Sequence, residues 1–359
     1  MSYIQRLANE HNSIAFGREE LAYYARHLLL PGIGLEGQQK LKCARVLVVG
    51  AGGLGCPALQ ALAGSGVGSI CIMDGDAVAG SNLSRQWLHT YRTIGQNKAL
   101  SAQAALEAIN PFIQVSAYPE MLDHSNAEQK IAGCDIVIDA TDELEVRYLI
   151  DDYCAALDRP WVHAALYRES AQMTVFWSRF GASFRKLYPV PSVAPSCSAS
   201  GLLGASASIV GNLQALEAIK LITGHGAPEV GTLCSLKTGN YPFERFHFDG
   251  SPPTQYSSPV QDSDSVPRAV SPIELKQALS IHKPLTILDL RKDSADRLPR
   301  AAHCSEASLL EGGLSNFETD QILLVCEEGL MSEMLAHALH GIEPRVHYLK
   351  GGMRAWREL

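Results

Sequence analysis

Long apolar runs are missing from this sequence. Its 359 residues contain no stretch of 18 consecutive apolar residues, which argues against a transmembrane helix. Residues 1–13 are polar and charged, with no apolar core and no small-residue cleavage site, so they do not resemble a signal peptide. We therefore expect a cytoplasmic chain that does not enter a membrane.

Cysteine pairs and an excess of positive charge are missing as well. The nine cysteines are scattered and form no C-x-x-C pair, which is typical of a reducing compartment with mostly buried thiols and one or two reactive ones. The 30 Lys and Arg against 38 Asp and Glu give a net charge of −8, which argues against nucleic acid as the main partner. The length allows two domains.

The sequence does contain a glycine-rich turn after an apolar run. Residues 45–55 read RVLVVGAGGLG, in which Val46–Val49 predicts a buried parallel strand. The glycines let the backbone turn tightly beside a phosphate, and a helix predicted over Cys56–Ala63 directs its N-terminal N–H groups toward that phosphate. By itself this pattern favours an NAD or FAD site.

Strands and helices alternate on both sides of a polar segment. Further strands are predicted at 69–74, 113–119, 134–140, 160–164 and 171–177, with helices between the first four. We expect an α/β protein with three parts: a Rossmann-like domain with a mixed, mainly parallel sheet over residues 1–250, a Ser- and Pro-rich linker over 251–268, and a small α/β domain over 269–359.

Charged residues gather where strands of the first domain end. Asp74, Arg85, Lys98 and Asp142 follow strands or loops at one edge of the sheet, and Arg26 lies on a helix predicted upstream. A dinucleotide does not need three cations, because the helix N-terminus holds much of its pyrophosphate. Cleavage of a triphosphate at its α-phosphate builds charge that Arg, Lys and Mg²⁺ stabilise. This grouping changes the prediction from NAD to ATP, with Asp142 as the Mg²⁺ ligand.

Five ordered motifs, GAGGLGCP, MDGDAVAGSNLSRQ, GQNKA, CDIVIDATD and GNLQALEAIK, resemble the MoeB/ThiF adenylyltransferases, relatives of ubiquitin-activating enzymes. The resemblance implies that ATP adenylates the C-terminal Gly-Gly carboxylate of a ubiquitin-fold sulfur-carrier protein. It implies an ATP site in which Asp74 binds the ribose and Asp142 binds Mg²⁺, formed by Gly52, Gly53, Asp74, Ser81, Asn82, Arg85, Gln86, Lys98, Asp142 and Glu143. It also implies that Arg26 reaches the site of a neighbouring subunit, and therefore a homodimer.

The sequence departs from this family at two places. Family members commonly carry a structural zinc on two C-x-x-C pairs, but Ser183 and Lys186 occupy the first pair's positions and the second region has no Cys, so we expect no zinc. Glu143 stands where Asn is usual. Cys197, in a Pro- and Ser-rich loop, matches a family cysteine that bonds covalently to the activated carrier; an inert buried thiol is the alternative.

A second resemblance covers residues 270–359. Cys326 follows a predicted strand and precedes a short loop and a helix, and together with the stretches LDLR and LKGGMRAW this resembles a rhodanese domain. Backbone N–H groups of such a loop stabilise a persulfide. Glu327 and Met331 stand where rhodanese loops carry Arg, and the carboxylates of Glu327 and Glu328 would repel thiosulfate. We expect a persulfide on Cys326; a degenerate binding module is the alternative.

These resemblances predict one sequence of reactions. The carrier is adenylated, the Cys326 persulfide displaces AMP and Cys197 resolves the intermediate, giving a thiocarboxylate. A cysteine desulfurase or thiosulfate would donate the sulfur. The alternatives are an adenylyltransferase or carrier-binding scaffold with an inactive rhodanese domain and, more remotely, an NAD-binding oxidoreductase.

Overall fold

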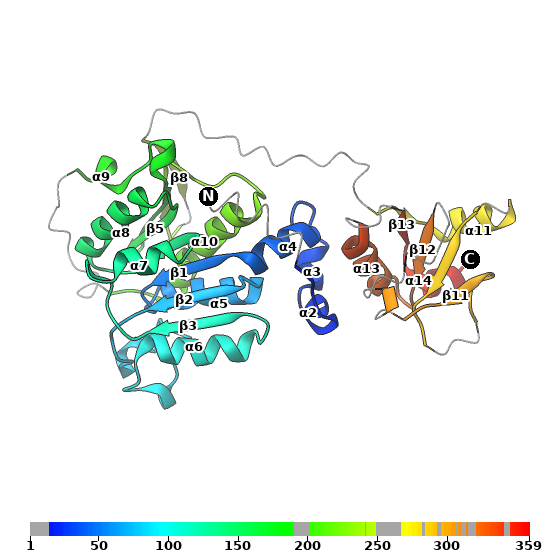
Figure 1. Ribbon diagram of the computed structural model, residues 1–359, viewed down its shortest axis with the longest axis horizontal. Helices are drawn as coiled ribbons and strands as arrows, with labels where there is room; N and C mark the ends of the chain where they lie inside the picture. Colours follow the sequence, from blue (N-terminus) through cyan, green and yellow to red (C-terminus); the bar gives the residue numbers. More distant parts are fainter. Residues whose placement is uncertain are drawn as a thin grey trace. The chain divides into compact units, whose positions relative to one another are not determined.

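The computed structural model describes residues 14–189, 201–240, 242–248, 267–281, 284–292, 296–305, 308–309, 314, 321–340 and 345–359. Cys197 and all but the last two residues of the expected linker lie outside this set. The chain divides into two compact units (Figure 1). The larger contains the described residues of Met1–Ile14 and Gln39–Ser258, and the smaller those of Ala15–Gln38 and Pro259–Leu359.

The larger unit is built on an eight-stranded sheet in the order β3-β2-β1-β4-β5-β6-β7-β8. Its strands are β1 (Arg45–Val49), β2 (Ser69–Met73), β3 (Gln114–Tyr118), β4 (Ile136–Asp139), β5 (Trp161–Tyr167), β6 (Ser170–Phe176), β7 (Thr232–Lys237) and β8 (Phe243–His247). The first five run parallel, and the last three continue the sheet in antiparallel pairs. The prediction of a mixed, mainly parallel sheet is confirmed.

Helices cover both faces of this sheet. One layer contains α5 (Gly55–Ser65), α6 (Lys98–Ile109) and α10 (Gly204–Thr223), and the other contains α7 (Ala127–Ala132), α8 (Leu144–Ala156) and α9 (Phe184–Leu187). Val46 and Val48 of β1 face the first layer, whereas Leu47 and Val49 face the second. Because neighbouring residues of a strand point to opposite faces, the unbroken apolar run of β1 is buried on both.

Three strand ends meet at one edge of the sheet. β1 lies between β2 and β4, and its Val49 is in register with Met73 and Asp139. The loops that begin at Gly50 and Asp74, and the loop that follows β4, therefore start side by side. In an open α/β sheet this edge is where ligands bind.

The smaller unit has a parallel sheet in the order β11-β10-β12-β13-β9. Its strands are β9 (Ala269–Val270), β10 (Thr286–Asp289), β11 (Ala301–His303), β12 (Ile322–Val325) and β13 (Val346–Leu349), and its helices include α11 (Pro272–Ser280), α13 (Leu330–His340) and α14 (Gly352–Arg357). Leu335 of α13 packs on one face, and Leu275 of α11 and Met353 of α14 on the other. This is the second α/β layer structure that the sequence predicts.

Two short helices upstream also belong to the smaller unit. They are α2 (Arg18–Tyr23) and α3 (Ala25–Leu28), ahead of α4 (Gly34–Cys43), and Ala25 packs against the core of this unit. The prediction of one helix over Glu19–Leu30 is wrong at Tyr24, whose backbone has φ −91° and ψ 11°. The buried Tyr24 ring packs against neighbouring aromatic rings, which accounts for the break.

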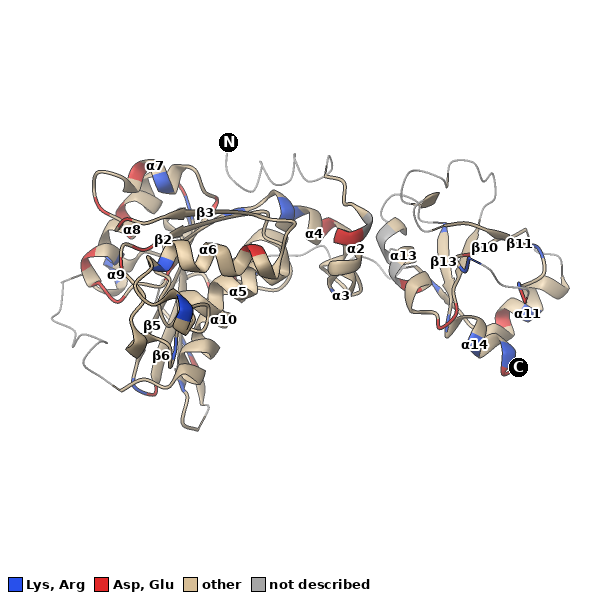
Figure 2. Cartoon of the chain, turned by 90° about the horizontal axis from the view of Figure 1, so that it is seen from below, with Lys and Arg blue, Asp and Glu red and all other residues tan. Residues whose placement is uncertain are grey.

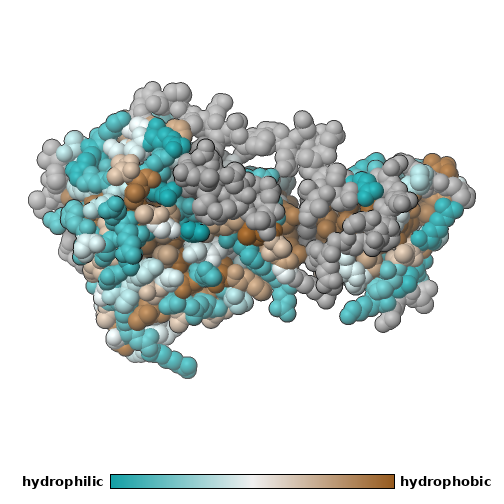
Figure 3. Space-filling view, in the orientation of Figure 1, coloured by the Kyte–Doolittle hydropathy of each residue, from teal (hydrophilic) through white to brown (hydrophobic). Residues whose placement is uncertain are grey.

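Among the described residues, none of the helices combines the length and apolar character needed to span a bilayer. Figure 2 shows Lys and Arg interspersed with Asp and Glu over the helices and loops. Figure 3 shows apolar residues in small areas between polar ones on the visible face. The surface in these views is therefore of mixed character.

Candidate functional site

A cavity of about 330 Å³ lies at the ends of β1, β2 and β4. Its lining includes every residue of the expected ATP site except Ser81, namely Gly52, Gly53, Asp74, Asn82, Arg85, Gln86, Lys98, Asp142 and Glu143. Cavities of this size are typical of small-molecule sites. The structure thus brings together residues from four separate sequence motifs.

The glycines between β1 and α5 differ in whether the backbone leaves room for a side chain. A Cβ atom at Gly55 would lie 1.9 Å from the Gly50 carbonyl oxygen, and one at Gly50 would lie 2.6 Å from the Ala140 carbonyl oxygen, so the fold requires both glycines. At Gly52 and Gly53 the nearest atoms would be 3.6 Å and 3.7 Å away, which is ordinary contact. Gly52 and Gly53 therefore line the cavity without being needed to relieve a clash within the chain.

Asp74 and Lys98 are held in place on the cavity wall. Asp74 accepts hydrogen bonds from the backbone N–H groups of Ala51 (2.8 Å) and Asp76 (2.9 Å). Lys98 Nζ donates to Asp76 Oδ2 at 2.6 Å. Asn97 caps α6 and donates to the Asp74 carbonyl oxygen at 2.8 Å. These contacts fix one carboxylate and one ammonium group at neighbouring positions.

Arg85 and Gln86 follow a 3₁₀ turn, η2 (Gly80–Asn82). Arg85 Nη1 donates to the Ser81 carbonyl oxygen at 3.1 Å, so Ser81 contributes its main chain behind the cavity lining. Asn82 Oδ1 accepts the Ala79 N–H at 3.0 Å and closes the turn. Gln86 is 4% exposed, and its Oε1 is one of the few buried side-chain oxygens without a hydrogen-bond partner in the described part of the chain. A polar ligand in the cavity would satisfy such an atom.

Asp142 and Glu143 lie exposed in the loop between β4 and α8. Over the residues that the structure describes, no hydrogen bond or ion pair engages either carboxylate. Two carboxylates of this kind on a cavity wall are suited to a hard cation. The departure at Glu143 thus places a second negative charge next to Asp142.

Sequence reasoning missed the residues that hold this loop. Asp139 ends β4, is fully buried, and accepts hydrogen bonds from His163 Nδ1 (2.8 Å) and Arg147 Nε (3.2 Å). Arg147 Nη2 also donates to the Thr141 carbonyl oxygen at 2.7 Å, and Arg147 lines the cavity. The one signal for His163 is strand register, because β5 places it opposite Asp139.

Burial and the neighbouring charged groups together determine the protonation states of Asp139 and His163. Burial raises the pKa of Asp139, but Arg147 and His163 outweigh it and hold that pKa below its ordinary value. Burial lowers the pKa of His163, so its ring is neutral at pH 7. An ionised Asp139 and Arg147 therefore form a fixed pair behind the Asp142 loop.

Ser183 and Lys186, at the positions of the missing cysteine pair, belong to the α9 turn. Ser183 Oγ accepts the Lys186 N–H at 3.2 Å. The buried Asp151 carboxylate, whose pKa is raised by burial, accepts the N–H groups of Phe184 (3.0 Å) and Arg185 (3.2 Å). No group of three or more His, Cys, Asp or Glu side chains suited to a metal ion occurs among the described residues. Hydrogen bonds hold this turn.

Two expected residues of the adenylation chemistry are not among those lining the cavity. Arg26 is exposed on α3 in the smaller unit. Cys197 lies outside the described residues. Their roles stay predictions.

In the smaller unit, Cys326 begins the loop between β12 and α13. Its Sγ accepts the Ser332 N–H at 3.4 Å, and its side chain is 7% exposed. The first turn of α14 holds the same loop, because Met353 N–H donates to the Cys326 carbonyl oxygen and Arg354 N–H to that of Glu327, both at 2.9 Å. Gly352 fits only without a Cβ, which would lie 2.4 Å from the Cys326 carbonyl oxygen. The thiol thus lies in a backbone-lined loop, as the sequence predicts.

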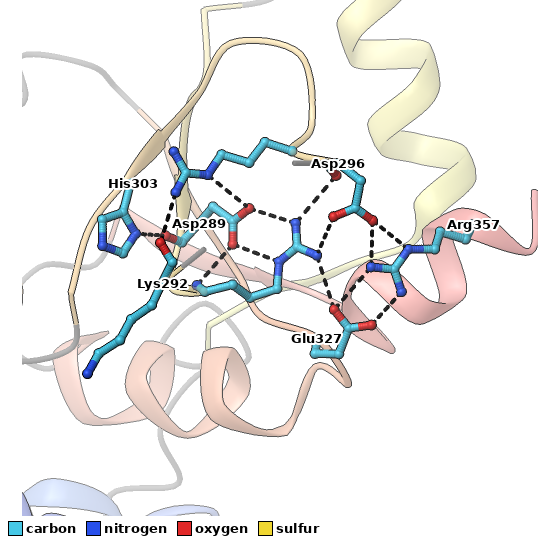
Figure 4. Close-up of polar contacts among 8 residues, drawn as sticks. Asp289, Lys292, Asp296, His303, Glu327 and Arg357 are labelled. Atoms are coloured by element: carbon cyan, nitrogen blue, oxygen red, sulfur yellow. Dashed lines mark hydrogen bonds and ion pairs between the residues drawn. The ribbon is translucent and has the colours of Figure 1, made fainter. Parts of the chain in front are cut away.

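The Glu327 carboxylate is ion-paired. Figure 4 shows Glu327 facing Arg357, and Arg291 Nη1 also donates to it at 3.1 Å. Both arginines contact Asp296, and Arg291 also contacts Asp289 at 2.8 Å. The pKa of Glu327 is held below its ordinary value, first by Arg357 and then by Arg291. These pairs weaken the repulsion of anions that the sequence predicts from Glu327.

Two family models match the chain, the ThiF family over residues 24–257 and the rhodanese-like domain over residues 271–359. A probable adenylyltransferase/sulfurtransferase MoeZ of Mycobacterium tuberculosis is 35% identical and covers 95% of this chain, with 94% of the relative matched. The adenylyltransferase and sulfurtransferase MOCS3 of Drosophila grimshawi is 33% identical over 94% of this chain and 84% of its own length.

A sulfur carrier protein adenylyltransferase of Thermus thermophilus is 42% identical over 60% of this chain and 83% of its own length. Among solved structures, E. coli MccB has a TM-score of 0.58 at 22% identity, over 68% of this chain and 74% of MccB, which shows the fold alone. The prediction of ATP in place of NAD is supported, because adenylyl transfer in this family uses ATP. The chain belongs to the ThiF family, as an adenylyltransferase and sulfurtransferase that joins a ThiF domain to a rhodanese-like domain.

Proposed function

We propose that this enzyme adenylates the C-terminal carboxylate of a ubiquitin-fold sulfur-carrier protein ending in Gly-Gly and then converts it into a thiocarboxylate. The observation that carries the proposal is the cavity at the strand ends, where open space beside Gly52 and Gly53 adjoins Arg85 and the unpaired Asp142 carboxylate. The Thermus thermophilus relative is named for a sulfur carrier protein, which supports the substrate class.

In the first step a carboxylate oxygen of the carrier attacks the α-phosphorus of ATP. The bond to the leaving pyrophosphate breaks, and an acyl adenylate forms. Arg85 and Lys98 stabilise the charge on the phosphoryl oxygens and on pyrophosphate, and Asp74 binds the ribose. The remaining contacts to the nucleotide come from Gly52, Gly53, Asn82 and Gln86, and the Ser81 carbonyl oxygen supports Arg85 from behind the lining.

Mg²⁺ fits the residues present, because Asp142 offers an unengaged carboxylate and hard cations prefer oxygen ligands. Asp142 would hold the ion, with the Glu143 carboxylate beside it. When bound, Mg²⁺ neutralises phosphate charge. Arg147 is a positioning residue in this proposal, since it fixes the loop through the Thr141 carbonyl oxygen and Asp139.

In the second step the terminal sulfur of a Cys326 persulfide attacks the acyl carbon, and AMP leaves. The product is an acyl disulfide between the carrier and Cys326. Attack of the Cys197 thiolate on the Cys326 sulfur releases the carrier as a thiocarboxylate and leaves a Cys197–Cys326 disulfide. A dithiol reductant then restores both thiols.

The sulfur donor is a persulfide on another protein in this proposal, with thiosulfate a poor substitute. Three carboxylates, Asp289, Asp296 and Glu327, neutralise three guanidinium groups, Arg291, Arg297 and Arg357, in the network around the Cys326 loop. A small dianion therefore finds these three guanidinium groups already paired with carboxylates. A cysteine desulfurase carries its sulfur as a protein persulfide and does not need such a charge.

Exposed side chains support two proposed partners, a second subunit and the carrier protein. Arg26 is exposed on α3, and we infer that in a homodimer it adds a cation to the nucleotide site of the second subunit. Trp87 (53% exposed) follows the cavity residues Arg85 and Gln86, and Leu203 (69% exposed) follows Leu202, also in the lining. These two apolar side chains are suited to contact the carrier beside its C-terminal tail.

The test is ATP–pyrophosphate exchange with purified carriers that end in Gly-Gly. Exchange should require the intact tail, and Asp142→Asn should abolish it, whereas Glu128→Gln, which removes an exposed carboxylate of α7, should not. Mass spectrometry of the carrier should then show replacement of a carboxylate oxygen by sulfur only when Cys326 is present. Exchange without thiocarboxylate would support the inactive-rhodanese alternative, and no exchange with any such carrier would refute the proposal.

A further inference from the structure

A second cavity, of about 230 Å³, lies in the larger unit and shares no lining residue with the nucleotide cavity. Two cysteines line it, Cys71 from the middle of β2 and Cys134 from the segment between α7 and β4. Tyr118 and Lys130 form part of the same wall. Nothing in the adenylation or sulfur-transfer chemistry uses these residues.

The two thiols line the same cavity and differ in environment. Cys71 is partly exposed, whereas Cys134 is only 3% exposed. The hydrogen bond from Cys134, followed by the charge of Lys130, lowers the pKa of Cys71 to about 7. The same hydrogen bond and burial raise the pKa of Cys134 well above its ordinary value. At neutral pH a reachable thiolate therefore faces a protonated thiol.

Lys130 is fixed where it can stabilise the thiolate. Its Nζ lies 3.3 Å from the centre of the Tyr118 ring and 2.8 Å from Glu120 Oε1. Tyr118 lies at the end of β3, next to β2 in the sheet, and also interacts with Cys71. The cavity thus combines a nucleophile, a cation, a proton donor and space for a small molecule.

We propose that Cys71 and Cys134 form a reactive dithiol that small hydroperoxides convert into an intramolecular disulfide. The Cys71 thiolate attacks one peroxide oxygen, the O–O bond breaks, and the leaving oxygen takes a proton as water or alcohol. The sulfenic acid on Cys71 then reacts with the Cys134 thiol, forming the S–S bond and releasing water. Both sulfurs are oxidised and the peroxide is reduced, so the electrons balance.

The first experiment treats the full-length wild-type protein with a few equivalents of hydrogen peroxide and then alkylates the remaining thiols. Peptide mapping should find a Cys71–Cys134 link, lighter by two hydrogen atoms than the reduced pair, and a dithiol reductant should remove it. In Cys154→Ser, which changes another buried cysteine, the link should form equally well. Cys71 joined only to other cysteines, or no link at all, would overturn the proposal.

A second experiment separates the two roles of Cys134 by alkylating Cys71 with iodoacetamide. Cys134→Ser keeps a hydrogen-bond donor but cannot form the disulfide, so Cys71 should stay reactive, and peroxide should leave a sulfenic acid that dimedone traps. Cys134→Ala loses the donor, and alkylation at pH 7 should be several-fold slower than in Cys134→Ser, because the smaller thiolate fraction is only partly offset by the greater nucleophilicity of a thiol with a higher pKa. Equal rates in the two variants would contradict the assignment of Cys134 as the donor.

Discussion

The two sites of this enzyme differ in whether charged side chains are left unpaired. In the nucleotide cavity Asp142 and Glu143 stay unengaged among the described residues, and Arg85 contacts a single carbonyl oxygen. Around the Cys326 loop the guanidinium groups of Arg291 and Arg357 are instead matched by carboxylates. A cavity with open charges is suited to a multiply charged ligand. A loop whose charges are already paired is suited to a neutral sulfur atom held by backbone groups.

Glycine substitutions should give the largest effects and separate the two sites. Gly55→Ala forces a Cβ to within 1.9 Å of the Gly50 carbonyl oxygen, so the larger unit should fail to fold and pyrophosphate exchange should vanish. Gly352→Ala has a similar clash with the Cys326 carbonyl oxygen and should abolish persulfide loading. Thermal unfolding and mass spectrometry would check both. Loss of pyrophosphate exchange in Gly352→Ala would contradict the expectation that this substitution affects only the Cys326 loop.

Removing an open charge should act on catalysis alone. Arg85→Ala should lower the rate of pyrophosphate exchange about 10²- to 10³-fold, as expected for loss of one donor to a developing anion. The melting temperature should hardly change, because Arg85 makes one described hydrogen bond. Arg92→Ala, which removes an exposed arginine from η3 (Tyr91–Thr93), is the control and should keep full activity.

Removing a paired charge within the same site should act on stability. Arg147→Met leaves the buried Asp139 carboxylate with fewer partners and should lower the free energy of unfolding by about 3 kcal/mol. Urea unfolding would measure the loss, with Arg92→Met as the matched control. An unchanged stability would mean that the Asp139 network does not hold the loop.

The same network predicts a pH dependence. The folded-state pKa values of Asp139 and His163 both lie below their ordinary values, so the stability that they contribute is present above the pKa of each unfolded group and is lost as pH falls through the folded pKa. Stability should therefore decline from about pH 6.5 downward. In Arg147→Met this decline should be shallower, and a slope equal to wild type would contradict the assignment.

Opening a paired charge near Cys326 should give the smallest effect. Glu327→Gln frees part of the charge of Arg291 and Arg357, so loading of Cys326 by thiosulfate should rise about tenfold through electrostatic attraction. Glu358→Gln, at the residue directly after Arg357 but outside the network, should leave loading unchanged. A fall in thiosulfate loading would contradict the proposal that thiosulfate is a poor donor because these guanidinium groups are paired.

Most of the fold could be predicted because the buried strands coincide with short apolar runs in the sequence. Strand β12 ends directly before Cys326, as predicted, and β1 begins one residue before the predicted run Val46–Val49. The strands β9 and β11 were missed, since two or three residues carry no periodicity. The break at Tyr24 accompanies packing of its buried ring against Phe16, Tyr23 and His27, which a helical apolar pattern does not report.

The residues of the candidate site also fall into those that the sequence could predict and those that it could not. The residues that line the cavity lie within contiguous motifs, so pattern and resemblance could find them. Arg147 and His163 could not be found, because their function depends on a buried Asp139 at a strand end and on the register between β4 and β5. Likewise, the pairing of Glu327 joins residues from three distant segments and only three-dimensional structure brings them together.

The contacts between α14 and the Cys326 loop have a consequence for hydrogen exchange. The amide protons of Met353 and Arg354 are bonded to the carbonyl oxygens of Cys326 and Glu327, so they can exchange with solvent only when the loop and the helix separate. Their exchange rates would report how often the loop opens, without any probe on the thiol. Where sulfur leaves Cys326 only through an opened loop, the rate of loop opening reported by these two amides is an upper limit on the rate of sulfur transfer.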